Sequence, residues 1–154
     1  MNLDSPRAPM RKDFWTRFSK THWEKKPGLF RRTGSALLEL GPDDIFELLV
    51  RYSERCRASN TADGVKIFVD GQLQYVDEVL RLLPVREDKS LRGYHVRMSR
   101  RFSDYCLVCD ELMRVSFEKW DRIGMHLRQL YKGVGVPNGC AEIGLYLGNY
   151  RKTS

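Results

Sequence analysis

The stretch VKIFVDGQLQYV, residues 65–76, decides the fold prediction. Its apolar and polar side chains alternate on both sides of the pair Asp70-Gly71. An Asp-Gly pair between two alternating runs is the strongest short sequence signal for a β-hairpin. The segment VDEVLRLLP, residues 76–84, then returns to helical spacing and ends at Pro84. A hairpin that leads directly into a helix indicates the α+β class.

Two helices are predicted before the hairpin. In GPDDIFELLVRYSERCRAS, residues 41–59, Pro42 suits the first helical turn and the next two aspartates complement the positive end of the helix. The apolar stripe of this helix comprises Ile45, Leu48, Leu49, Tyr52 and Cys56. Residues 13–26 form an aromatic helix that Pro27 ends, and GLF, residues 28–30, is predicted as a short extended piece. The aromatic residues near one face of this helix are Phe14, Trp15, Phe18 and Trp23.

The later part of the chain is predicted as strand, helix and strand. GYHVRM, residues 93–98, alternates like a strand, with Tyr94, Val96 and Met98 on one side and His95 and Arg97 on the other. Residues 103–132 follow a helical pattern, as one helix or two, and GVGVPNG, residues 133–139, is a loop. The buried side of the helical part comprises Met113, Phe117, Trp120, Ile123, Leu127 and Leu130.

CAEIGLYLGNY, residues 140–150, is predicted as the final strand. Its alternation places Ile143, Leu145 and Leu147 on one face. The opposite face carries Gly144, Tyr146 and Gly148, and the glycines indicate a bend or a close backbone approach. Residues 1–11 are predicted to be disordered, and residues 12–154 to form a single domain.

Composition limits the possible partners. A chain of 154 residues with 42% apolar content can bury a core, and its net charge of +7 permits an anionic partner. Because no run reaches five or six like charges, nucleic acid is not the expected partner, whereas an acidic protein remains open. No stretch of about 18 apolar residues and no hydrophobic N-terminal segment occurs, so we expect a cytoplasmic protein without a membrane partner.

The pair Cys106 and Cys109, in CLVC, has a spacing shared by redox and zinc sites. A zinc site needs four ligands. No second such pair follows, and the histidines at positions 22, 95 and 126 are scattered. The pair is therefore interpreted as two buried small side chains, and no metal site is predicted.

Catalytic residues cannot be assigned from spacing. The sequence has no nucleophile-elbow, phosphate-loop, dinucleotide or zinc-protease motif. Asp110 and Glu111 are adjacent, so on a helix their carboxylates point about 100° apart and cannot flank one atom. His126, within a predicted helix, has no partner at a defined spacing and is interpreted as structural. The prediction is no catalytic residue.

The order of the parts resembles the N-terminal half of the cupin-type, JmjC-like oxygenases. The resemblance rests on the sequence segments HWEKKPGLFRR (22–32), GPDDIFELL (41–49), LRQLYKGVGVP (127–137) and AEIGLYLGNYRKTS (141–154). WEKKP, Trp23–Pro27, is its most specific part, and the whole spans residues 12–154. The resemblance implies a helix-rich N-terminal portion leading into a double-stranded β-helix that binds iron(II) and 2-oxoglutarate and hydroxylates a protein or a small molecule.

The chain departs from this family at the metal motif. The family's His-x-Asp or His-x-Glu with a distant second histidine is missing, and only His22 has an acidic residue, Glu24, two positions later. That pair falls at a helix end and lacks a second histidine in register. A facial triad needs three ligands on one side of the iron.

The expectation is therefore a truncated or split oxygenase segment with an incomplete β-helix. It would hold no metal or cofactor alone and would be inactive alone, with a missing C-terminal half or a second chain as its partner. The resemblance makes Tyr146 and Asn149 candidates for lining the substrate cavity. A non-enzymatic binding or assembly protein, which holds an acidic partner on a basic surface, stays open as the alternative.

Overall fold

The computed structural model describes residues 14–28, 40–136 and 144–149, apart from the side chains of Arg122 and His126. The described residues form two compact units. Unit 1 contains residues 14–28 and 118–136, and unit 2 contains residues 40–117 and 144–149. No helix in these ranges is long and apolar enough to cross a membrane. The predicted segments 1–11 and 29–30 and the last three residues of the predicted loop 133–139 lie outside the described residues. The loop prediction was wrong at its start, because a helix extends to Val134.

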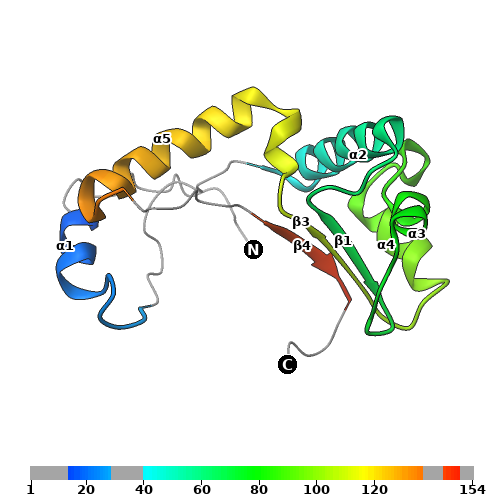
Figure 1. Cartoon of the computed structure of the whole chain (residues 1–154), viewed down its shortest axis with the longest axis horizontal. Coiled ribbons are helices and arrows are strands. Elements are labelled where there is room, and N and C mark those ends of the chain that lie inside the picture. The colour runs from blue at the N-terminus through cyan, green and yellow to red at the C-terminus, as the bar shows by residue number, and fades with distance from the viewer. Residues whose placement is uncertain (1–13, 29–39, 137–143, 150–154) are drawn as a thin grey trace, which may run out of the picture. The chain divides into compact units, whose positions relative to one another are not determined.

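Unit 2 is built on a four-stranded antiparallel sheet with the order β2-β1-β3-β4 (Figure 1). The strands are β1 (Val65–Val69), β2 (Gln72–Leu73), β3 (Tyr105–Cys109) and β4 (Leu145–Gly148). The predicted hairpin is confirmed, because β1 and β2 pair across Asp70 and Gly71. Both turn residues have positive φ, 48° and 78°, as a tight turn between antiparallel strands requires.

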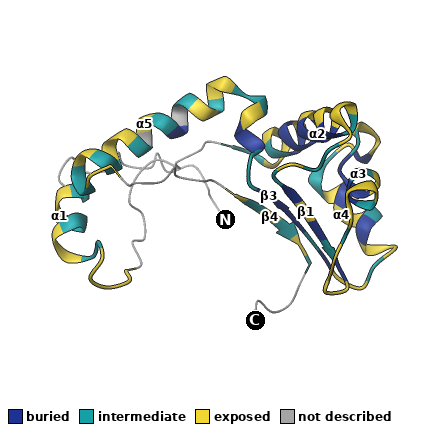
Figure 2. Ribbon diagram, viewed as in Figure 1, coloured by how far each residue is buried: buried dark blue, intermediate teal, exposed yellow. Residues whose placement is uncertain are grey.

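Helices cover one face of this sheet. The helices of unit 2 are α2 (Pro42–Ser59), α3 (Val76–Leu82) and α4 (Leu91–Ser99), with short 3-10 turns η1 (Arg86–Asp88) and η2 (Leu112–Val115). Figure 1 shows α2, α3 and α4 grouped on one side of the strands. Ile67, Leu107 and Tyr105 of the strands are buried, as are the helix residues Leu49 and Leu82. Figure 2 shows the buried residues of unit 2 in dark blue along the strands and the helices. This layer is the core of unit 2.

The predicted helices α2 and α3 are confirmed. Pro42 is the first residue of α2, and Asp44 at the first turn accepts a hydrogen bond from the Gly41 amide at 3.0 Å. Of the predicted apolar stripe, Leu48, Leu49, Tyr52 and Cys56 are buried, whereas Ile45 is half-buried. Helix α3 starts at Val76 and ends just before Pro84, as its spacing predicted.

Residues 93–98 form part of helix α4, so the strand prediction for GYHVRM was wrong. The Ser90 hydroxyl caps this helix by accepting a hydrogen bond from the Gly93 amide at 3.0 Å. Tyr94 and Met98, four residues apart, are both fully buried, while Val96 is 39% exposed. Because a six-residue window fits both a two-residue and a four-residue repeat, its periodicity alone does not distinguish the two.

The helical prediction for residues 103–132 was wrong at its start. Residues 105–109 are β3, which pairs with β1 along its whole length, and the helix α5 begins only at Phe117 and ends at Val134. Within the predicted buried side, Met113 and Ile123 are buried, but Phe117 and Trp120 are exposed. The segment YCLVC is apolar throughout, which removes the periodic signal that separates strand from helix.

Unit 1 consists of helix α1 (Phe14–Thr21) and most of α5. Helix α1 is shorter than the predicted 13–26, and a turn continues it to Lys25, whose ammonium donates to the Lys20 carbonyl at 2.7 Å. The aromatic ring of Phe18 lies within 6.1 Å of the rings of Phe14 and Trp23. On α5, a Cβ placed at Gly133 would lie 2.8 Å from the Cβ of Trp15, so glycine permits the close approach of the two helices.

Candidate functional site

The sheet of unit 2 has two faces of different character. The odd-numbered residues of β1 and β3 point to the helices, and we call this side the helix face. We call the opposite side the open face. Its side chains are Lys66, Phe68, Leu73, Cys106, Val108 and Tyr146. Leu73 is 55% exposed and Tyr146 is 63% exposed. Within the described part of unit 2, the helices lie on the other side (Figure 1).

The strand register aligns the open-face side chains in two rows. One row runs from Leu73 through Phe68 and Cys106 to Gly148. The neighbouring row runs from Lys66 through Val108 to Tyr146. Directly opposed side chains of antiparallel strands lie about 5 Å apart and pack on each other. The two rows make the open face mostly apolar, with a lysine and a tyrosine at the ends of one row and the buried Val108 between them.

Tyr146 lies on the open face, as the alternation predicted. Leu145 and Leu147 are half-buried, whereas Tyr146 and Gly148 are exposed; Ile143 lies outside the described residues. A Cβ at Gly144 would lie 3.1 Å from the Tyr146 ring and 3.0 Å from a carboxylate oxygen of Asp110. Gly144, just before β4, thus leaves room for the tyrosine ring; the atoms near it belong to side chains, so the predicted close backbone approach is not what this glycine provides.

Asn149 is held in a different environment from Tyr146. Its side-chain oxygen accepts a hydrogen bond from the Tyr105 amide at 2.9 Å, and its side-chain amide donates to the Ser103 carbonyl at 3.3 Å. Its backbone amide also donates to the Tyr105 carbonyl at 3.2 Å. Asn149 therefore ties the end of β4 to the start of β3. The structure does not bring the two predicted cavity residues together, and their contact with a substrate stays a prediction.

The two edges of the sheet are unequal. Strand β2 has only two residues, both polar or exposed, and the chain turns from it into α3. Strand β4, with the sequence LYLG, carries no charge and no proline, and in the described residues it pairs only with β3. Native sheets usually protect an edge with short strands, charges or prolines. The β4 strand is short but carries neither charge nor proline, and among the described residues no strand lies beyond it.

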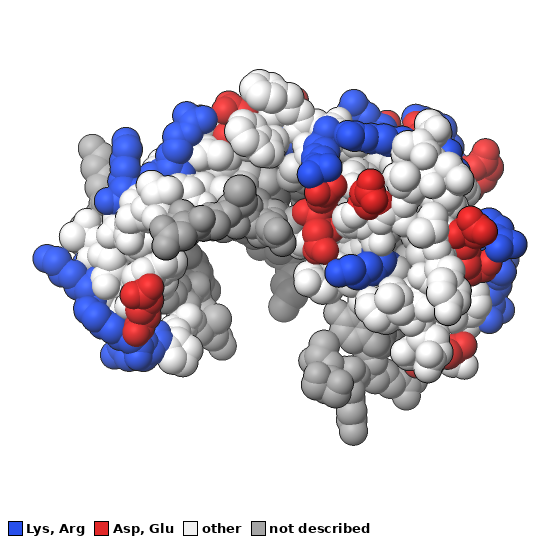
Figure 3. Space-filling view, in the orientation of Figure 1, with Lys and Arg blue, Asp and Glu red and all other residues white. Residues whose placement is uncertain are grey.

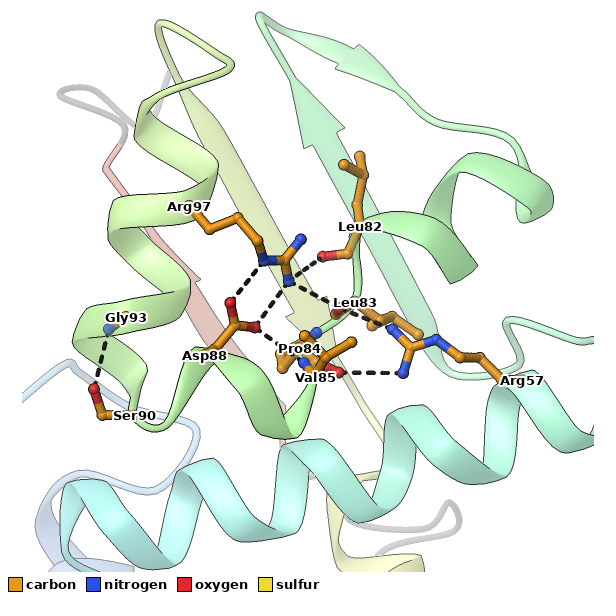
Figure 4. A network of polar contacts seen from close by, with 9 residues as sticks. All are labelled: Arg57, Leu82, Leu83, Pro84, Val85, Asp88, Ser90, Gly93 and Arg97. Carbon is orange, nitrogen blue, oxygen red and sulfur yellow. Dashed lines mark hydrogen bonds and ion pairs between the residues drawn. The ribbon is translucent and has the colours of Figure 1, made fainter.

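Behind the sheet, two arginines organise the turn that follows α3 (Figure 4). The Arg97 guanidinium makes a bidentate pair with Asp88, at 2.7 and 2.9 Å, and also donates to the Leu82 and Leu83 carbonyls. Its hydrogen bonds to Asp88 raise the pKa of Arg97. Because the last carbonyls of a helix lack intrahelical donors, this arrangement ends α3 without leaving its carbonyls unpaired.

Arg57 reaches the same turn from α2. Its guanidinium donates to the carbonyls of Leu80, Leu83 and Pro84 at 3.0, 2.9 and 3.3 Å. Burial and the neighbouring Arg97 lower the pKa of Arg57. Neither Arg57 nor Asp88 is predicted from sequence patterns, because their partners are 23 to 27 and 9 residues away and no local pattern reports such contacts. The cluster is structural support for the helix face.

The pair Cys106 and Cys109 lies on a strand, so the two thiols face opposite sides of the sheet. Cys106 is half-buried on the open face, and Cys109 is buried on the helix face. Burial raises the pKa of Cys109 to about 12 and also raises the pKa of Cys106. Both thiols thus favour the protonated form, which is neither a good nucleophile nor a good metal ligand.

The acidic pair Asp110 and Glu111 follows β3 and does not lie on a helix surface as predicted. The Glu111 carboxylate accepts from the Tyr52 hydroxyl at 3.3 Å and pairs with Arg114. Tyr52 also donates to the Asp63 carbonyl at 2.7 Å, and burial raises its pKa. Glu111 therefore links the end of β3 to α2, which is a structural role.

The histidines do not form a metal site with described neighbours. His22 Nδ1 lies 2.7 Å from the Thr21 hydroxyl, and His95 Nδ1 shares a hydrogen bond of 2.9 Å with the Tyr105 hydroxyl. Glu24 lies in the turn after α1 with a positive φ of 56°. Among the described side chains, no three histidines, cysteines or carboxylates are grouped to hold a metal ion.

Compared with known protein families, curated proteins and solved structures, the chain matches none. Its architecture defines an α+β protein in which helices cover one face of an open, antiparallel four-stranded sheet. The described strands do not close into a β-helix. The open face and the β4 edge are the features that call for a functional explanation.

Proposed function

We propose that this chain supplies the helical half and the first strands of a cupin-type, JmjC-like 2-oxoglutarate oxygenase. The observation that carries the proposal is the open face, an apolar sheet surface on the side opposite the helices. Tyr146 and Gly148 of the last strand lie on it. Cupin folds are double-sheet structures, in which the inner faces of two antiparallel sheets enclose the cavity. An open face of this kind suits the inner wall of such a cavity.

The edge of β4 supports the same proposal. A sheet that is to be extended needs a terminal strand free of charges, prolines and bulges, and the LYLG strand has this character. Asn149 fixes the strand end on β3, so the edge is held in place for pairing. Further strands added at this edge would continue the antiparallel sheet toward a second layer.

The iron ligands would come from a segment outside these 154 residues. A 2-oxoglutarate oxygenase holds iron(II) through imidazole and carboxylate groups. The described open-face side chains include neither a histidine nor a carboxylate. In this proposal the open face forms part of the wall of the substrate cavity. Tyr146 offers a hydroxyl and Lys66 a cation, and the apolar side chains of the two rows exclude water.

The test compares the 154-residue chain with a protein extended by the codons that follow Ser154. In anaerobic iron(II) titration and a succinate-release assay, we expect the 154-residue chain to show neither stoichiometric binding nor turnover of 2-oxoglutarate. The extended protein should bind one iron and turn over. In it, Tyr146→Ala should lower turnover, while Tyr75→Ala, another exposed tyrosine, should not.

Two results would contradict the proposal. If the 154-residue chain itself bound iron and released succinate, the metal site would have to be sought at His22 and Glu24. If the following codons encoded no His-x-Asp strand, and no separate segment raised the melting temperature of the chain, the non-enzymatic binding protein would become the better account.

A further inference from the structure

A run of positive charge without a carboxylate crosses helix α4. Residues 89–102 contain the cations Lys89, Arg92, Arg97, Arg100 and Arg101 and no aspartate or glutamate. The surrounding range 40–117 carries nearly equal numbers of cations and carboxylates. Figure 3 accordingly shows both signs side by side on the visible face of unit 2. The charge of α4 is therefore a local excess and does not follow from the composition of the unit.

Four of these five cations lie outside the core. Arg97 turns inward and is neutralised by Asp88. We call the other four the α4 basic face: Lys89, Arg92, Arg100 and Arg101, all exposed. Tyr94 and Met98 are fully buried under the helix, so its position on the sheet is well defined. Arg92 lies on this packed helix and Arg100 is its C-cap, while Lys89 and Arg101 lie just beyond its two ends.

The cations of the α4 basic face are not neutralised by carboxylates of the described chain. Elsewhere in unit 2, arginines pair with carboxylates, as Arg86 does with Glu54 at 2.8 Å and Arg81 with Glu78 at 3.2 Å. Within the described chain, Lys89, Arg92 and Arg100 make no side-chain hydrogen bond or ion pair. The Arg101 guanidinium stacks on the Phe102 ring, 5.2 Å from its centroid, and keeps its charge exposed.

The spacing on α4 matches an extended peptide. Arg92, Val96 and Arg100 recur every four residues and lie on one side of the helix. At 1.5 Å per residue, the two arginines are about 12 Å apart along the axis. In an extended chain, residues four apart are separated by about 13 Å, and the residue midway between them points to the same side. An acidic residue, an apolar residue and a second acidic residue at alternate positions would meet Arg92, Val96 and Arg100.

We propose that the α4 basic face binds an extended acidic segment of a partner protein, with an apolar side chain on Val96. Guanidinium groups pair bidentately with carboxylates and phosphates alike, so charge alone does not separate a peptide from a nucleic acid. Val96 favours the peptide, because the side chain exposed between the two arginines is aliphatic, whereas nucleic-acid bases stack on aromatic rings. This inference goes beyond the oxygenase proposal and does not depend on it.

The test is fluorescence anisotropy with a short labelled peptide that carries glutamates four residues apart and a leucine midway. We expect binding that weakens with added salt and that Arg92→Glu with Arg100→Glu reduces more than about tenfold. Arg51→Glu with Arg55→Glu, on the exposed side of α2, makes the same charge change elsewhere and should reduce binding by less than about threefold. Val96→Ala should weaken binding, and thermal melting should show that all variants fold.

Four outcomes would overturn the proposal. The first is an absence of measurable binding by the folded wild-type protein. Equal losses in the α2 control would mean non-specific attraction. Tighter binding of a single-stranded RNA of equal charge, lost in the α4 variant, would make the face a nucleic-acid site. Self-association of the protein that disappears in the α4 variant would make it a contact between copies of this chain.

Discussion

The two faces of one sheet differ in how far their side chains are buried. On the helix face, the side chains of β1 and β3 are buried beneath α2, α3 and α4. On the open face, the same two strands present Phe68 and Cys106, which are half-buried, and Val108, which is buried, between the exposed Leu73 and Tyr146. Because both faces are largely apolar, composition does not explain the difference; the helices cover one of them only. Among the described residues of unit 2, no helix lies over the open face (Figure 1).

The largest loss of stability is expected at Gly93, where helix α4 packs tightly against the backbone of η1. A Cβ at Gly93 would lie 1.8 Å from the Asp88 carbonyl oxygen. Because backbone must move to admit it, Gly93→Ala should lower the free energy of unfolding by about 3 kcal/mol or more. Urea denaturation measures the loss.

Gly124→Ala is the matched control, because the nearest atom to its added Cβ, at 3.8 Å, is the flexible end of Arg128. The better helix propensity of alanine should leave that variant unchanged or more stable by up to about 1 kcal/mol. Equal stability of the Gly93 and Gly124 variants would contradict the tight contact between α4 and η1.

The next effect concerns the ion pair behind the helix face. Asp88→Asn leaves Arg97 with no carboxylate, and we expect a loss of about 3 kcal/mol because both side chains are largely buried. Glu54→Gln breaks the exposed pair with Arg86 and should lower stability far less than Asp88→Asn does. Chemical denaturation of both variants measures the difference. Similar costs would mean that the Asp88 pair contributes no more than a surface pair.

A direct comparison of the two faces uses apolar truncations on paired strands. Ile67→Ala, on the helix face, should cost about 2–5 kcal/mol by leaving a cavity. Leu73→Ala, on the open face, should cost less than about 1 kcal/mol because the side chain is already half in water. Thermal and urea unfolding measure both. A large cost at Leu73 would show that the open face is covered within this chain.

A smaller change in stability is expected at two buried tyrosines, Tyr94 of α4 and Tyr105 of β3, whose rings meet edge to face. The Tyr94 hydroxyl is buried without a hydrogen-bond partner among the described residues, whereas the Tyr105 hydroxyl bonds to His95. Tyr94→Phe should therefore leave stability unchanged or raise it by up to about 1 kcal/mol, and Tyr105→Phe should lower it by about 1 kcal/mol. Calorimetry of the two variants measures the sign. A loss in the first would reveal a partner for Tyr94.

The smallest energetic effect is a difference in thiol reactivity that leaves stability unchanged. In a Cys140→Ser background, a maleimide should label Cys106 in the folded protein, because this thiol is half-buried on the open face. Cys109 should react only after unfolding, because it is buried and its pKa is raised to about 12. Mass spectrometry with and without urea measures both. Equal labelling of the two thiols in the folded protein would refute the assignment of opposite faces.

Local signals identified several elements correctly. The Asp70-Gly71 turn, Pro42 at the start of α2, Pro84 after α3 and the alternation of Leu145 to Gly148 all act within a few residues, and each prediction is confirmed. The candidate site was identified less well. Alternation placed Tyr146 on the face opposite Leu145 and Leu147. No local pattern predicted that the Asn149 side chain would form hydrogen bonds with the backbone at the start of β3.

Two segments, residues 93–98 and 105–109, adopt a secondary structure that differs from the one their local sequence predicts. GYHVRM fits an alternating strand as well as a helix turn, and YCLVC is apolar at every position. The hydroxyl cap of Ser90 and the pairing of Arg97 with Asp88 stabilise the first as helix. Pairing with β1 makes the second a strand, and it separates Cys106 from Cys109 onto opposite faces.

The turns, the caps and the amphipathic faces of single elements follow from local sequence, because backbone preferences and side-chain periodicity act over about four residues. Only the tertiary structure decided which face of the sheet the helices cover, which strand lies at the edge, and how Arg57 of α2 reaches the end of α3. These outcomes depend on contacts between residues distant in the chain. Such contacts form when the packing of whole elements removes apolar surface from water, and no short window of sequence records that packing.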